Sequence, residues 1–99
     1  MKTEYTVRAF EEELGSEYFI ITVPEGTSEE EVYANLEMAG EYASINSDCE
    51  KEDYDKHFKT MVRMREECSG TECFEYYLKK FCKYKVKCVS DICDYEFEW

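Results

Sequence analysis

Two apolar stretches near the start of the chain predict a pair of β-strands. In the first, Tyr5, Val7 and Ala9 share one parity, as in a strand with one buried face. In the second, residues 17–23 are apolar enough for a central strand, which Pro24 ends. A short turn would connect these strands, so the sequence predicts an N-terminal β-hairpin.

A helix with two contrasting faces is predicted next. Thr27 with Glu30, or Ser28 with Glu31, fits a capping box, in which side chains satisfy free backbone N–H groups. At 100° per residue, four apolar residues fall within an arc of about 60°: Val32, Leu36, Ala39 and Ala43. Three carboxylates fall on the opposite side: Glu30, Glu37 and Glu41. One face would be buried, and the other would be an exposed stripe of carboxylates.

The second half of the chain predicts two more helices and a second hairpin. Residues 54–68 and 71–83 have helical periodicity. Arg65 falls in the apolar stripe of the first, so either that helix is shorter or the guanidinium snorkels or pairs with a carboxylate. Residues 84–99 alternate on both sides of a break, which predicts a C-terminal β-hairpin. We therefore expect an α+β fold with two hairpins and about three helices, in one domain spanning residues 1–99.

Four of the six cysteines form two C-x4-C pairs, Cys68 with Cys73 and Cys88 with Cys93. In a reducing compartment, four such thiols bind a tetrahedral Zn²⁺ more readily than they form disulfides. The sequence thus predicts one structural zinc ion that ties a helix corner to the C-terminal hairpin. Unligated thiols are the alternative, because the spacing is looser than in zinc ribbons.

The two remaining cysteines have different surroundings in the sequence. Cys82 joins the apolar stripe of the third helix, so burial is the simpler interpretation, and Cys49 lies in a polar stretch as a surface thiol or spare ligand. The chain has no apolar run long enough for a membrane span, and residues 1–4 do not resemble the start of a signal peptide. We expect a cytoplasmic protein; secretion would instead imply disulfides.

Charge is distributed unevenly along the chain. The net charge is −12, and residues 1–50 hold 13 acidic and 2 basic side chains, a balance of −11. No Lys or Arg occurs from Ala9 to Glu50. Such a surface repels nucleic acid and membranes and attracts basic grooves. Nine Tyr, six Phe and one Trp argue against a disordered acidic tail.

Catalytic signatures are missing from the sequence, which predicts that the protein is not an enzyme. His57 is the single histidine, and neither a Gly-rich phosphate loop nor a nucleophile elbow is present. An enzyme that uses its thiols would need at least one exposed thiol of low pKa. The many carboxylates make an apparent acid–base pair easy to find by chance.

A short, strongly acidic, single-domain chain of this kind resembles the small inhibitors that phages and mobile elements direct against host nucleases, the anti-CRISPR and anti-restriction proteins. The resemblance is one of type, without a shared motif: it covers size, acidity, the segment 9–50 and the predicted zinc site. It implies a protein in the bacterial host cell that occupies a basic nucleic-acid channel or blocks a conformational step of a CRISPR effector nuclease. A local basic patch at residues 79–87 departs from a pure DNA mimic.

The predicted contact residues combine the carboxylate stripe with aromatic anchors. Glu37 and Glu41 would lie about 6 Å apart along the helix and Glu30 about 10 Å further back, a spacing of the order of phosphates along a strand. Tyr33 and Tyr42 would supply the packing that holds a partner. The competing hypothesis is a zinc-stabilised adaptor whose protein partner is unrelated to nucleic acid.

Overall fold

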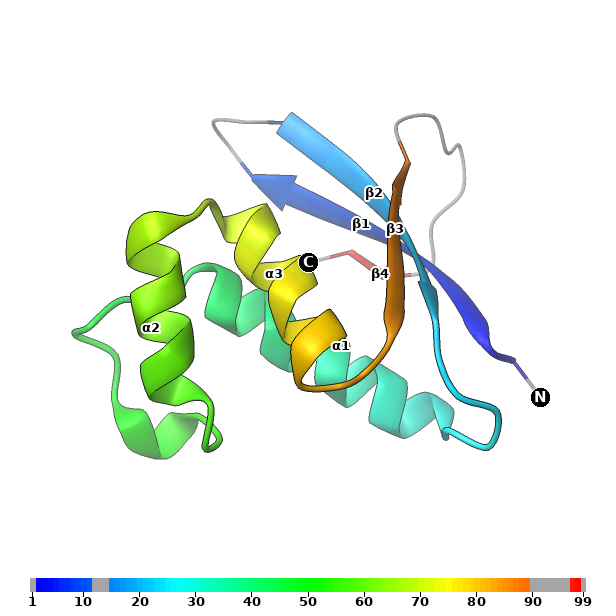
Figure 1. Ribbon diagram of the computed structural model, residues 1–99, viewed down its shortest axis with the longest axis horizontal. Coiled ribbons are helices and arrows are strands. Elements are labelled where there is room, and N and C mark those ends of the chain that lie inside the picture. The colour runs from blue at the N-terminus through cyan, green and yellow to red at the C-terminus, as the bar shows by residue number, and fades with distance from the viewer. Residues whose placement is uncertain (1, 12–14, 90–96, 99) are drawn as a thin grey trace.

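The computed structural model describes the backbone of residues 2–11, 15–89 and 97–98, and side chains within those ranges except for residues 9–11, 15–17, 88–89 and 97–98. The elements in chain order are β1 (Glu4–Glu11), β2 (Gly15–Thr22), α1 (Glu29–Ala43), a 3₁₀ turn η1 (Lys51–Asp53), α2 (Phe58–Glu67), α3 (Gly70–Lys80), β3 (Lys85–Val89) and β4 (Phe97–Glu98) (Figure 1).

The strands form one sheet in the order β3-β2-β1-β4. β1 and β2 are antiparallel neighbours, with Tyr5 opposite Ile21 and Val7 opposite Phe19. β3 runs antiparallel to β2, and β4 runs parallel to β1. The α+β class, the N-terminal hairpin and the three helices are therefore confirmed.

The predicted C-terminal hairpin has a different arrangement. Its turn and most of its second strand, residues 90–96 and 99, lie outside the described residues. The described parts, β3 and β4, lie at opposite edges of the sheet and do not pair with each other. Alternation of apolar residues shows which side chains share a face but does not identify the neighbouring strand, so the sequence pattern was compatible with both arrangements.

The core lies between one face of the sheet and the helices (Figure 1). Alternate side chains of β1 and β2 point from the sheet into this core and are buried, namely Tyr5, Val7, Phe19 and Ile21. On α1, the predicted apolar arc is buried at all four positions, Val32, Leu36, Ala39 and Ala43. Burial of a large apolar side chain contributes about 1.5–3 kcal/mol each, so this interface holds the helices on the sheet.

Arg65 joins the C-terminal ends of two helices. Its Nε donates a hydrogen bond to the Ala43 carbonyl at 2.8 Å, and its Nη1 donates to the Cys68 carbonyl at 3.2 Å. These carbonyls belong to the last turn of α1 and to the residue that caps α2, where cations and donors stabilise unpaired backbone oxygens. The helix predicted for residues 54–68 is shorter in the structure, where α2 spans Phe58–Glu67.

A left-handed residue lies between α3 and β3. Lys83 has φ 63°, and beyond it the Tyr84 N–H donates to the Leu78 carbonyl at 3.0 Å. This conformation turns the chain from the end of α3 into β3. Lys79 and Lys80 lie in the last turn of α3, where cations complement the helix dipole.

Candidate partner-binding face

The carboxylate stripe of α1 is formed as the sequence predicts. Ser28 is the N-cap, and its hydroxyl accepts a hydrogen bond from the Glu31 N–H at 3.2 Å, so the second of the two capping alternatives is observed. Glu30, Glu37 and Glu41 are all exposed. They lie opposite the buried arc, and their carboxylates are available to a partner.

The charge of this stripe is not balanced within its own helix. α1 contains no Lys or Arg. On α3, by contrast, Glu75 forms a salt bridge with Lys79 one turn later, with a distance of 2.6 Å. α1 therefore presents a row of like charges, which gives a stronger long-range potential than a mixed surface does.

A further exposed carboxylate follows α1 in the chain. Asp53, in η1, is exposed. Burial and a hydrogen bond with Cys49 raise the pKa of Tyr54, and the nearby charges of Glu41 and Asp53 raise it further. Tyr54 follows Asp53 directly, and its ring packs on that of Tyr42, the neighbour of Glu41, with 5.1 Å between centroids, so the segment that carries Asp53 lies beside the end of α1. We call Glu30, Glu37, Glu41 and Asp53 the acidic face.

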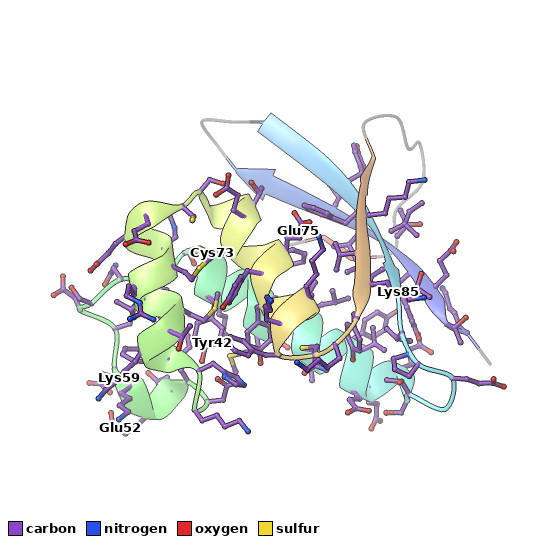
Figure 2. All side chains as sticks on the ribbon, in the orientation of Figure 1. Tyr42, Glu52, Lys59, Cys73, Glu75 and Lys85 are labelled. Atoms are coloured by element: carbon purple, nitrogen blue, oxygen red, sulfur yellow. The ribbon has the colours of Figure 1, made fainter. Side chains whose placement is uncertain are left out.

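The two predicted aromatic anchors differ in accessibility. Tyr33 is half-buried, with its ring edge-on to Tyr5 at 5.9 Å between centroids. Tyr42, labelled in Figure 2, is fully buried in the structure, so it is not exposed as an anchor would be, and its contact with a partner stays a prediction. It follows Ala39 by three residues and so lies only about 60° from it, at the margin of the buried arc. Tyr54 is half-buried and packs on Tyr42 with 5.1 Å between ring centroids, and the sequence patterns had not singled it out as a candidate.

Tyr42 instead contributes to a polar cluster centred on Asp55. The hydroxyls of Tyr42 and Tyr77 donate to the two carboxylate oxygens of Asp55, at 2.5 and 2.7 Å. The His57 N–H also donates to this carboxylate at 2.9 Å. The cluster ties the loop before α2 to residues of both α1 and α3. A helical spacing of Tyr77 with Phe74 and Phe81 was present in the sequence, but no local pattern marked Asp55.

Hydrogen bonding sets the ionisation of this cluster. Burial alone would raise the pKa of Asp55, but the bonds from Tyr42, Tyr77 and the His57 backbone outweigh it and lower that pKa below its ordinary value. Burial and the facing carboxylate raise the pKa values of both tyrosines. At neutral pH the cluster is one carboxylate held by two neutral phenols, which is a structural arrangement.

The first cysteine pair is divided between two environments. Cys73 is fully buried in the first part of α3 (Figure 2), whereas Cys68 is half-exposed after α2. A hydrogen bond with Glu72, followed by burial, raises the pKa of the Cys68 thiol. The corner that was predicted to hold a metal is present, but only one of its thiols reaches the surface.

The second pair lies largely outside the described residues. Cys88 belongs to β3, opposite Phe19, but its side chain is not described, and neither is any part of Cys93. Across the described part of the chain, no three His, Cys, Asp or Glu residues form a group that could hold a metal ion. Zinc binding by Cys68, Cys73, Cys88 and Cys93 therefore stays a prediction.

The thiols with shifted pKa values are poor nucleophiles. Burial, together with the charges of Asp55 and Glu31, raises the pKa of Cys82 to about 12. That of Cys68 is also raised, as described above. Thiolate is the reactive form, so neither thiol is activated at neutral pH.

Comparison with protein-family models, curated proteins and solved structures gives no match to this chain. Within the described residues, none of the helices has the length and apolar character needed to cross a membrane.

Proposed function

We propose that this protein inhibits a nucleic-acid-binding enzyme, specifically a CRISPR effector nuclease, by presenting its acidic face to the enzyme's Lys- and Arg-lined surface. The observation that carries the proposal is the exposure of Glu30, Glu37 and Glu41 along a helix without any basic residue. A protein bound there would block nucleic-acid loading, because both ligands need the same cationic surface.

Electrostatics and packing have separate parts in this mechanism. Opposite charges across a solvated rim mainly increase the association rate and select the partner. Residence time depends on buried contacts, for which Tyr33 and Tyr54 are the half-buried aromatic residues beside the acidic face. The protein would therefore associate quickly at low salt and dissociate according to its aromatic contacts.

The test is inhibition of DNA cleavage by a panel of bacterial RNA-guided nucleases, followed by charge reversal. The variant Glu30→Lys, Glu37→Lys, Glu41→Lys should associate with a sensitive nuclease at least about tenfold more slowly at low salt. Its association rate should also fall less steeply with added salt. Stopped-flow binding and cleavage assays measure both effects.

A control variant separates this local effect from net charge. Glu4→Lys, Glu66→Lys, Glu67→Lys changes three exposed glutamates that are not part of the acidic face, one in β1 and two at the end of α2, and both triple variants raise the net charge from −12 to −6. The control should retain most of the inhibition. Equal inhibition by the parent and the α1 variant would contradict the proposal and favour an adaptor with a partner unrelated to nucleic acid.

A further inference from the structure

A cavity of about 310 Å³ lies beside the first half of α1. It is bounded by the β2–α1 connection, the residue before α2 and the chain that follows α3. Its lining combines one carboxylate, one amide and aromatic rings, contributed chiefly by Glu31, Asn35, His57, Phe81 and Tyr84. The volume is at the lower end of the range for small-ligand pockets and suits a single long side chain.

The polar groups of the cavity favour a positively charged donor. Asn35 Nδ2 donates to the Tyr84 hydroxyl at 2.8 Å, which leaves the amide carbonyl oxygen as an acceptor. Glu31 supplies a carboxylate. Burial raises the pKa values of Cys82 and Tyr84, and the Glu31 charge raises both further, so its negative potential extends into the cavity.

The aromatic part of the lining is held in place. The rings of His57 and Phe81 are stacked, with centroids 3.6 Å apart and planes 9° from parallel. Phe81 also lies edge-on to Tyr77, at 5.7 Å. One face of each stacked ring is covered by the other, so a planar cation would stack on an outer ring face, which is already fixed and carries no entropy cost of ordering a loose side chain.

We infer that this cavity binds the guanidinium group of an arginine side chain presented by the protein partner. A guanidinium is planar, stacks on aromatic rings and carries five donors in a fork that matches a carboxylate such as Glu31. A lysine ammonium offers a compact charge but no plane to stack. Carbonyl and carboxylate acceptors with a negative potential disfavour an anion in the same space.

The position of the cavity explains how one partner would reach both sites. Glu31 follows Glu30 directly and lies about 100° further round α1, so the cavity borders the acidic face. The inference rests on the proposed function, because it assumes a partner with a basic surface. It adds that one arginine enters a defined cavity while other cations contact exposed carboxylates.

A titration with small molecules tests the cavity without any nuclease. N-acetyl-L-arginine methylamide should shift the NMR signals of the Asn35 side-chain amide and the Tyr84 ring, with a dissociation constant on the order of 1 mM. Matched lysine and norleucine derivatives should bind several-fold more weakly. Equal binding of the lysine derivative would overturn the guanidinium assignment, and absence of shifts with the arginine derivative would overturn the cavity as a binding site.

A pair of neighbouring variants provides the residue-level control. Glu31→Gln removes the charge, and glutamine is also accepted at the third position of a capping box, so α1 should be retained. It should weaken binding of the arginine derivative about fivefold. Glu30→Gln removes an equal charge one residue away and should change binding less than twofold. Equal losses in both variants would overturn the role of Glu31.

The nuclease assay separates failure of this inference from failure of the proposed function. If the triple lysine variant of α1 loses inhibition and Glu31→Gln weakens it by a similar factor as in the titration, both are supported. If the triple variant loses inhibition but Glu31→Gln inhibits like the parent, the partner does not use the cavity, and the inference is overturned while the proposed function stands.

Discussion

Asp55 shows how one residue can connect parts of the chain that are far apart in sequence. Its carboxylate accepts hydrogen bonds from Tyr42 on α1 and Tyr77 on α3. Both tyrosines are buried, so removal of the acceptor leaves two phenolic hydroxyls inside the protein without their partner. Unsatisfied buried donors are costly, which makes Asp55 more important to stability than its half-exposed position suggests.

Replacing Asp55 should destabilise the fold in a graded and pH-dependent manner. Asp55→Ala should cost about 3 kcal/mol, and Asp55→Asn about 1–2 kcal/mol, because the amide keeps one acceptor but not the charge. The lowered pKa stabilises the native state above the ordinary carboxyl value of 3.8, and this contribution is lost as the pH falls through the lower native value. Asp55→Asn should therefore lose less stability than the parent between pH 5 and 3.

Urea unfolding at several pH values measures these effects. Asp53→Ala is the control, since Asp53 is exposed and should change stability by no more than about 0.5 kcal/mol. If Asp55→Asn and the parent had the same acid profile, the hydrogen bonds of the cluster would not be what holds the Asp55 carboxylate ionised.

Helical periodicity in the sequence predicted which side chains are buried and which are exposed. It did not predict the side chains whose position depends on tertiary contacts. The arc from Val32 to Ala43 and the exposure of the three glutamates followed from helical geometry alone. The sequence left open whether the helix is shorter or the Arg65 guanidinium snorkels or pairs with a carboxylate. In the structure that guanidinium donates to a backbone carbonyl of α1, 22 residues earlier, which no local pattern indicates. Tyr42 is buried and its hydroxyl donates to Asp55, 13 residues later, a contact that no local pattern marked.

At the scale of elements, the end of α3 offers a direct test of backbone strain. Lys83 has φ 63°, a left-handed conformation that glycine adopts freely but other residues adopt at a cost of about 1–2 kcal/mol. Lys83→Gly should stabilise the protein by about 0.5 kcal/mol once the greater freedom of glycine in the unfolded chain is included. Thermal unfolding followed by circular dichroism should show a rise of a few degrees.

The same substitution three residues earlier should have the opposite sign. Lys80 is exposed in the last turn of α3, where glycine is a poor helix former, so Lys80→Gly should cost up to about 1 kcal/mol. A fall in melting temperature for both variants would show that the conformation of Lys83 is not strained.

The helices and strands were largely predictable from the sequence, but the pairing of the strands within the sheet was less so. Period-2 and period-3.6 patterns gave the N-terminal hairpin and three helices. A capping box placed the start of α1 at Ser28, with Thr27 as the competing alternative. The pairing of β3 with β2 rather than with β4 depends on where three helices return the chain, and no local pattern contains that information.

At the scale of the whole molecule, the zinc prediction can be tested through the one thiol of the first pair that reaches the surface. Metal analysis of protein purified under reducing conditions should find one zinc ion per chain. Cys68→Ser and Cys88→Ser should each lose the metal and lower the melting temperature, because a four-thiolate site contributes directly to folding. Cys73→Ser is uninformative, since Cys73 is fully buried and its replacement is destabilising without any metal.

Cys49→Ser is the matched control for this experiment. Cys49 is half-buried near Tyr54 and is not among the predicted ligands, so its replacement should leave the metal content unchanged. A metal-free parent protein, or a Cys68→Ser variant with unchanged metal content, would refute the predicted site and leave the cysteines as unligated thiols.

The sequence predicted the acidic face as far as that face depends on charge. It did not predict the cavity beside the first half of α1. Uneven charge and helical phase together identified Glu30, Glu37 and Glu41. The cavity joins residues from 24 to 84, and most of them had another role or none in the sequence patterns. Only the packing of the end of α3 against the start of α1 brings them together.

The strand order also determines the sequence in which the sheet can assemble. Only three residues separate β1 from β2 in the sequence, whereas roughly 60 residues separate Thr22 from its partner Lys85 in β3. The entropy lost in closing that long connection must be offset by contacts that form late, so we expect the hairpin to form before β3 joins the sheet. Until β3 arrives, the edge of β2 has open backbone donors and acceptors. That edge is where a folding intermediate of this protein would be most prone to self-association.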